Sequence, residues 1–201
     1  AVVNAMILLP FILLFSPAGH VANRYPKPRV MQIAAWAAVV VTLLITFSYA
    51  QGWFRAAFAL TLILAAKSAF YSPAKYGYIR EISGTDNIAA GNGVVQATTT
   101  IAILAGMFVF SFLFERTLAA HPAAKTADEM LKLMIPLGWL LVGNSVIELV
   151  LAYRLPTFTQ DSSHEDFSVR QYFRGDYLRD NIKALREQRV IWLSIIGLST
   201  Y

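Results

Sequence analysis

The chain has 201 residues and a formal net charge of +5; 57% of its residues are hydrophobic and only 14% are charged. Soluble domains carry about 25% charged residues, so this composition excludes an ordinary soluble domain. The sequence contains no cysteine, which excludes disulfide bonds and thiolate metal sites within these residues.

The apolar residues are gathered in long blocks instead of being spread as in a globular core. A transmembrane helix needs about 20 mostly apolar residues. The sequence therefore predicts an all-α, polytopic transmembrane helical bundle with four full spans and a partial span at each end, as expected for a fragment of a longer chain. In chain order the segments are Ala1–Phe15, Val30–Ala50, Ala56–Ser72, Ile88–Phe114, Met130–Tyr153 and Val190–Tyr201.

Basic side chains are concentrated in alternate loops. The loops Gln51–Arg55 and Glu115–Glu129 contain few of them. Because cytoplasmic loops are enriched in Lys and Arg, we expect these two loops outside and the loops Ala18–Arg29, Pro73–Asn87 and Arg154–Arg189 in the cytoplasm. Topology thus explains the positive charge, and no nucleic-acid partner is expected. The basic residues of the expected cytoplasmic loops are Arg24, Lys27, Arg29, Lys75, Arg80, Arg154, Arg170, Arg174, Arg179, Lys183, Arg186 and Arg189.

The last of these loops changes character along its length. A polar linker comes first, and Leu178, Ile182 and Leu185 then recur at helical spacing among charged residues. This pattern is typical of a helix that lies on the membrane surface, and a solvated linker helix fits it equally well. A long cytoplasmic connection is also typical of the boundary between two halves of a transporter.

Lys67 lies inside the second full span, and Glu148 is the one acid well inside a full span, the last. A charge near the middle of the bilayer costs about 2.5–3.5 kcal/mol, so such a residue usually faces a cavity or a partner. Lys67 is a candidate for substrate binding, or it reaches along lipid to the membrane surface. Glu148 is a candidate partner of Lys67, a candidate proton or cation coupling site, or an interfacial acid.

The stretch FYSPAKYGYI places a proline and a lysine at the end of an apolar run. We expect Pro73 to end or bend the helix, because proline lacks the backbone N–H. Lys75, with Tyr71 and Tyr76 nearby, is a candidate to bind a phosphate, which suits the compact charge of lysine. The alternative is that Lys75 only anchors the helix end at the cytoplasmic interface.

The span Ile88–Phe114 carries a polar stripe, because Asn92, Gln96 and Thr99 or Thr100 recur every three or four residues. We expect these side chains to line a cavity, since amides that face lipid are costly, or else to form hydrogen bonds between helices. The span also contains two pairs of small residues that allow close helix packing: Gly93 with Ala97, and Ala102 with Gly106.

The loop sequence GHVANRYPKPRVM, Gly19–Met31, is similar to the signature between the second and third helices of the major facilitator superfamily. That signature runs Gly-x-x-x-Asp-Arg-x-Gly and continues with basic residues, so the glycine is expected to allow close packing and the basic residues to hold the loop at the membrane surface. Pro26 replaces the second glycine and an asparagine replaces the acid, which weakens the case for a charge relay. The signature positions here are Gly19, Asn23, Arg24, Lys27 and Arg29.

Together with NRYPKPRVM and AAGNGVVQATTTIAILAG, the stretch FYSPAKYGYI resembles the lysophospholipid transporter branch of this superfamily. Some members of that branch are fused to an acyltransferase. The resemblance implies that residues 1–153 are an N-terminal transmembrane bundle without its first helix, and that residues 154–189 are the cytoplasmic loop between two bundles. Residues 190–201 would then begin the C-terminal bundle.

The implied function is movement of lysophospholipid across the inner membrane by alternating access, without a cofactor or metal. The first alternative is a facilitator of the same fold that carries a small polar solute or drug. The second is a membrane anchor for a fused phospholipid acyltransferase. Catalysis within these residues is not expected, because no His-x-x-x-x-Asp pair, phosphate-binding loop or nucleophile elbow occurs in the sequence.

Overall fold

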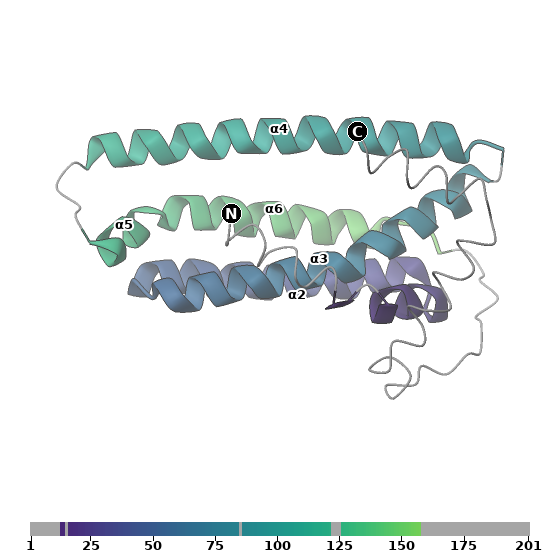
Figure 1. The fold of residues 1–201 in the computed structure, drawn as a ribbon, viewed down its shortest axis with the longest axis horizontal. Helices are drawn as coiled ribbons and strands as arrows, with labels where there is room; N and C mark the ends of the chain where they lie inside the picture. The colour runs from purple at the N-terminus through teal and green to yellow at the C-terminus, as the bar shows by residue number, and fades with distance from the viewer. Residues whose placement is uncertain (1–12, 15, 85, 122–125, 158–201) are drawn as a thin grey trace. The chain divides into compact units, whose positions relative to one another are not determined.

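The structure, a computed structural model, describes residues 13–14, 16–84, 86–121 and 126–157 (Figure 1). All of them lie in the first of two units into which the chain divides, Ala1–Ser163. The regular secondary structure of these residues is entirely α-helical. The predicted all-α class is therefore confirmed.

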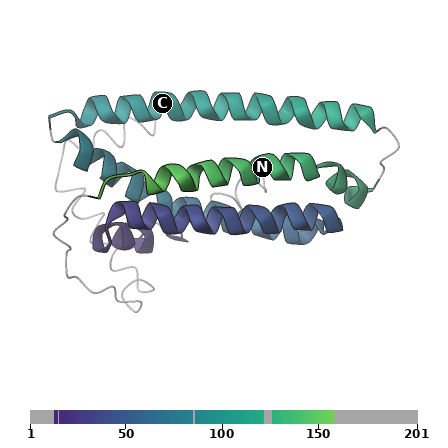
Figure 2. The ribbon, with the colours of Figure 1, turned by 180° about the vertical axis from the view of Figure 1, so that it is seen from behind.

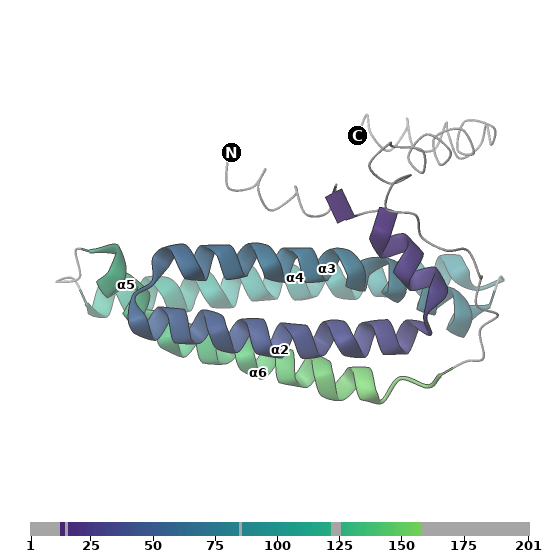
Figure 3. The same ribbon diagram turned by 90° about the horizontal axis from the view of Figure 1, so that it is seen from below.

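The helix α2 (Lys27–Gln51) lies between two others, α3 and α6, as Figure 3 shows. Pro28 is in its first turn, where a missing N–H leaves no helical hydrogen bond unmade. Gly52 ends the helix with a left-handed φ of 74°, a conformation that glycine adopts without strain. Between these ends α2 buries Ala35 and Ile45 almost completely, so its small and branched side chains form the centre of the packing.

The helix α3 (Phe54–Ser83) continues through Pro73 instead of ending there. The expected loop Pro73–Asn87 is thus helical as far as Ser83, which corrects the predicted boundary. Ala74 and Tyr78, on the turns after the proline, are buried, and this packing offsets the hydrogen bond that proline removes. Figure 1 shows α3 changing direction in its second half, the bend that a proline produces inside a helix.

The expected span Met130–Tyr153 is divided into two helices, α5 (Ala127–Leu133) and α6 (Ile135–Tyr153). The short helix α5 begins with a capping box: the Glu129 N–H donates to the Thr126 hydroxyl at 3.3 Å, and the Thr126 N–H donates to the Glu129 carboxylate at 3.2 Å. This local hydrogen bonding stabilises a separate helix start, so the apolar span begins only at α6.

The remaining long helix, α4 (Ile88–Ala120), has no buried residue against the described part of the chain. Figure 2, like Figure 1, shows it running alongside α6 and α3 on the side away from α2. Its closest approach to α3 is near its start, where Gly91 faces the side chains of Ile79 and Ser83. The faces of α4 are therefore largely open to lipid or to parts of the protein beyond the described residues.

Helices long and apolar enough to cross a membrane number four among the described residues. They correspond to the four predicted full spans, so a multi-pass membrane protein is confirmed. Their bounds are Lys27–Gln51, Phe54–Ser83, Ile88–Ala120 and Ile135–Tyr153.

The signature segment Gly19–Met31 is not the loop that the sequence predicts. Residues 16–24 are helical, α2 begins at Lys27, and only Tyr25 and Pro26 separate the two helices. Gly19 does not provide close packing either, because no described atom lies within 4 Å of the position that an added Cβ would take. The preference of the pre-proline residue for extended backbone explains why the chain turns within so few residues.

Close packing at glycine occurs at a position that the sequence analysis did not single out. An added Cβ at Gly138 of α6 would lie 2.7 Å from the Thr46 hydroxyl of α2. At Gly93 and Gly106 of α4 nothing lies within 4 Å in the described structure. The predicted packing role of these small residues in α4 therefore stays a prediction, whereas α2 and α6 do pack closely at Gly138.

Three predicted segments lie outside the described residues. They are most of the first partial span (residues 1–12), most of the last cytoplasmic loop with its surface helix (residues 158–189), and the expected start of a second bundle (residues 190–201).

Candidate functional site

Two charged side chains well inside the membrane helices, Lys67 and Glu148, form an ion pair. The Lys67 Nζ on α3 donates to both carboxylate oxygens of Glu148 on α6, at 2.8 and 3.1 Å. The lysine side chain is 11% exposed and the glutamate side chain 25% exposed. Of the readings that the sequence left open, the structure thus supports pairing, and Lys67 does not reach for the membrane surface.

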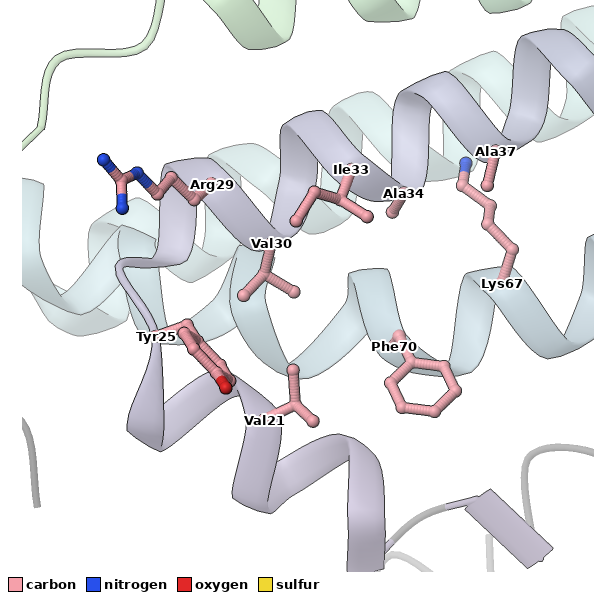
Figure 4. Close-up of a pocket in the computed structure, with 9 residues that line it drawn as sticks. All are labelled: Val21, Tyr25, Arg29, Val30, Ile33, Ala34, Ala37, Lys67 and Phe70. Carbon is pink, nitrogen blue, oxygen red and sulfur yellow. The ribbon is translucent and has the colours of Figure 1, made fainter. Parts of the chain in front are cut away.

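Small residues on α2 make room for this pair. The two charges come from helices on either side of α2, whose residues Ala34, Ala35 and Ala38 are buried. Figure 4 shows the Lys67 ammonium of α3 beside Ala37 of α2. The Lys67 side chain therefore runs past α2 where that helix carries small side chains.

An aromatic ring completes the surroundings of the lysine. The Lys67 Nζ lies 5.0 Å from the centroid of the Tyr71 ring, one turn along α3. A cation within about 6 Å of an aromatic face is attracted by the ring quadrupole. The ring of Tyr71 therefore attracts the Lys67 ammonium without taking up its hydrogen bonds.

A largely apolar groove of about 470 Å³ adjoins the ion pair. It lies between the helix formed by residues 16–24, α2 and α3 (Figure 4). Lys67 and Arg29 are the charged residues in its lining, and the guanidinium of Arg29 points away from it. The lining consists of Val21, Tyr25, Arg29, Val30, Ile33, Ala34, Ala37, Lys67 and Phe70.

A second ion pair, which the sequence analysis missed, joins Lys27 at the start of α2 to Glu81 near the end of α3. The Lys27 side chain is only 9% exposed, so it does not sit at the membrane surface as the signature predicts. Gly77 makes the space for it, because a Cβ at that position would collide with the lysine methylenes. In the sequence, Gly77 and Glu81, one turn apart, were the signal that could have indicated a partner for Lys27 on this helix.

The predicted phosphate-binding residues are only partly brought together. Lys75 is half-buried, its Nζ lies 5.2 Å from the centroid of the Tyr76 ring, and it has no acidic partner among the described residues. Lys67 lies eight residues earlier, about 12 Å away along the helix. Tyr71 therefore accompanies Lys67, while Tyr76 accompanies Lys75.

The polar stripe of α4 meets no other described helix. Asn92, Gln96 and Thr100 are exposed, and the Thr100 hydroxyl donates to the Gln96 carbonyl of its own helix at 3.0 Å. Val95, which precedes Gln96 and lies on another side of α4, is half-buried. A cavity-lining role for the stripe stays a prediction.

The remaining signature residues are surface groups in this structure. Asn23, Arg24 and Arg29 are exposed. Within the described ranges no group of three or more His, Asp or Glu side chains is arranged to hold a metal ion.

Comparison with known proteins finds lysophospholipid transporters among the relatives of this chain. The chain is 34% identical over 118 residues to a lysophospholipid transporter LplT of Photorhabdus laumondii, covering 59% of this chain and 28% of the relative. The LplT of Serratia proteamaculans is 35% identical over 105 residues, covering 52% of this chain and 23% of the relative. The predicted resemblance to lysophospholipid transporters is confirmed.

The match to these transporters is partial. The LplT of an Enterobacter species is 34% identical over 102 residues, covering 50% of this chain and 24% of the relative. The chain thus spans about a quarter of the length of the curated relatives that it matches. No protein-family model matches the chain, and no solved structure matches it.

Proposed function

We propose that this chain is part of a transporter that moves lysophospholipid across the bacterial inner membrane. The observation that carries the proposal is the similarity, at 34–35% identity over about half of the chain, to proteins named lysophospholipid transporter. The four apolar helices support it, because the chain provides a membrane-crossing bundle and not a soluble lipid carrier.

The site contains the two kinds of surface that a lysophospholipid requires. Its headgroup needs polar partners at membrane depth, and the Lys67–Glu148 pair provides opposite charges there. Its single acyl chain needs an apolar surface, which the groove beside Lys67 provides. Buried charges inside a membrane protein commonly mark a substrate or ion path.

Alternating access is the mechanism that this proposal implies. Residues 1–153 would form the first bundle without its first helix, residues 154–189 the connecting loop, and residues 190–201 the start of the second bundle. The two bundles would rock about a central cavity and open it to each side in turn. Lys75, at the cytoplasmic part of α3, would contact the phosphate as the lipid enters or leaves, and Gln96 would line the cavity.

An enzyme that acylates the delivered lysophospholipid, fused or associated, is the partner that this function calls for. The relatives are named as transporters, which fits a non-enzymatic role for the part of the protein that matches them.

The test uses the full-length protein reconstituted into vesicles. Fluorescent lysophosphatidylethanolamine is added to the outer leaflet, and the fraction that albumin can no longer extract is followed with time. We expect a faster loss of extractable lipid than in protein-free vesicles. Equal rates would contradict the proposal and favour either a polar-solute carrier or a membrane anchor.

A further inference from the structure

A second pocket lies where the C-terminal end of α4 meets α5 and the start of α6. Its volume is about 600 Å³, and ligand pockets commonly have about 300–1,000 Å³. Figure 1 shows α5 and this end of α4 at the same end of the helices. Pro136 in its lining is about 18 Å from Glu148 along α6, so this pocket is separate from the Lys67–Glu148 pair.

The pocket combines positive charges from two helices. Arg116 of α4 and Lys132 of α5 are in its lining, and no acidic residue of the described part of the chain is. The acids of α5 are engaged elsewhere: the Glu129 carboxylate takes part in the capping box, and Asp128 lies against Gly52 at the turn between α2 and α3. The positive charge of the lining is therefore unbalanced, and an anion suits it.

The α4 wall of the pocket changes from apolar to polar toward the end of the helix. Four residues recur at intervals of three or four positions and so lie on one face: Leu113, Arg116, Thr117 and Ala120. His121 follows at the outer end, where its Nδ1 lies 3.0 Å from the Thr117 carbonyl oxygen. The leucine is thus nearest the middle of the bilayer, and the arginine and the imidazole are nearer the water.

The opposite wall has the same order. Ile135 and Pro136, which begin the membrane-crossing helix α6, are apolar, and Lys132 in the last turn of α5 precedes them on the water side. Both walls therefore place apolar side chains toward the bilayer and a cation toward the water. A phospholipid at the membrane surface has its acyl chains and its phosphate in this same order.

We propose that this pocket binds an anionic diacyl phospholipid of the surrounding bilayer, which stays with the protein and is not transported. The phosphate binds Arg116 and Lys132, and the upper part of the acyl chains lies along Leu113 and Ile135. The lipid fills space between α4 and α6, at the end of a helix that buries no residue against the described part of the chain. The proposal holds for whichever solute the protein carries.

Net charge favours an anionic over a zwitterionic headgroup. Phosphatidylglycerol brings a phosphate and no cation to the pocket. Phosphatidylethanolamine brings its own ammonium group close to Arg116 and Lys132, and like charges repel. Water and salt screen charges at the membrane surface, so the resulting preference is modest.

The helix dipole does not account for both cations. Lys132 is in the last turn of α5, where a positive charge is favourable. Arg116 lies before the last turn of α4, so the same explanation does not extend to it. A shared ligand explains why the two side chains line one pocket.

The test follows the thermal unfolding of the purified full-length protein in detergent as lipid is added. We expect phosphatidylglycerol to raise the unfolding temperature at about fivefold lower concentration than phosphatidylethanolamine does. Arg116→Gln and Lys132→Gln should each remove most of this difference. Arg55→Gln is the matched control, because it removes an exposed cation that is predicted on the same side but is not in the lining, and it should keep the difference.

A pocket-filling variant distinguishes a site from general attraction between charges. Ala120→Phe keeps both cations and places a large side chain in the lining. It should also lose the preference for phosphatidylglycerol. Because Ala120 is exposed, this variant keeps the proposal testable if a charge variant does not fold.

Equal stabilisation of the wild type by the two lipids would overturn the proposal, and so would an unchanged preference in the charge and pocket-filling variants. Soluble glycerophosphoglycerol is the remaining probe, and we expect it to have no effect at the same concentration. Stabilisation equal to that by phosphatidylglycerol would indicate a site for soluble anions and would overturn the assignment to a lipid. None of these measurements requires lysophospholipid transport, so their outcome is independent of the proposed function.

Discussion

At the scale of single residues, the Lys67–Glu148 pair is both a functional candidate and a structural constraint on α3 and α6. Each side chain is charged in a part of the chain that crosses the membrane, and each offsets the cost of the other. Because the residues are 81 positions apart in sequence, the contact also connects two helices that are separated by α2. Its removal therefore changes packing as well as charge.

We expect Lys67→Met or Glu148→Met alone to destabilise the full-length protein by about 2 kcal/mol, less than for a fully buried pair because Glu148 is partly exposed. The double variant should cost clearly less than the sum of the two single variants, since it leaves no unpaired charge. Thermal unfolding in detergent measures all four proteins. Strict additivity would show that the two side chains do not interact.

At the scale of helices, α2 and α6 pack closely where Gly138 faces Thr46. The Thr46 hydroxyl donates to the Thr42 carbonyl of its own helix at 2.8 Å, so it satisfies its hydrogen bond without a partner on α6. Nearby, the hydroxyls of Thr42 and Ser145 lie 3.4 Å apart across the same interface. Small and hydroxyl side chains are what bring membrane helices close together.

Gly138→Ala should destabilise the protein by about 1–3 kcal/mol, because its new Cβ would be 2.7 Å from the Thr46 hydroxyl and the interface would have to separate. Gly143→Ala on the same helix is the matched control. Nothing lies within 4 Å of its Cβ position among the described residues, so it should be neutral or slightly stabilising.

Adding Thr46→Ala to Gly138→Ala should recover much of the lost stability, because it removes the Thr46 hydroxyl and methyl group, which are the two atoms nearest to the new Cβ. Thermal unfolding in detergent is measured for the wild type and these three variants. A Gly138→Ala protein as stable as Gly143→Ala would show that the two helices do not pack closely at this point.

The helices themselves were predictable from the sequence, and their ends were not. Long apolar blocks indicate spans whatever surrounds them, because the bilayer sets the length. The end of α3 depends instead on Ala74 and Tyr78 being buried, and the Tyr78 hydroxyl also donates to the Pro156 carbonyl beyond α6 at 2.9 Å. Such tertiary contacts stabilise α3 beyond Pro73. They cannot be predicted from the local effect of a proline on its helix.

The candidate site was predictable by residue type but not by partner. Lys67 and Glu148 stand out because charges are rare in apolar spans, yet spacing along one helix says nothing about a partner on another. Lys27 illustrates the reverse case: its place in a basic signature indicates a surface anchor, while Glu81 and Gly77 draw it into the interior. Contacts between segments that are distant in sequence determine both the pairing of Lys67 and the burial of Lys27.

At the scale of the whole molecule, the distribution of basic residues predicts which way the bundle is inserted. The predicted outside loops hold Arg55, Arg116 and Lys125, whereas most of the other basic residues are in the three predicted cytoplasmic loops. The structure is compatible with this alternation, because α2, α3, α4 and α6 follow one another along the chain as four candidate membrane spans. Membrane orientation itself stays a prediction from the positive-inside rule.

Single introduced cysteines test the orientation, since these 201 residues contain no cysteine. In the full-length protein without other cysteines, Ser163→Cys in the predicted cytoplasmic loop should react with an impermeant maleimide only after the cells are opened. Ala124→Cys in the predicted outside loop should react in intact cells, and it serves as the control for reagent access. Labelling of Ser163→Cys in intact cells, together with protection of Ala124→Cys, would mean that the bundle has the opposite orientation. The cytoplasmic positions assigned to Lys75 and to the connecting loop would then be wrong as well, because all of them depend on the same alternation of basic loops.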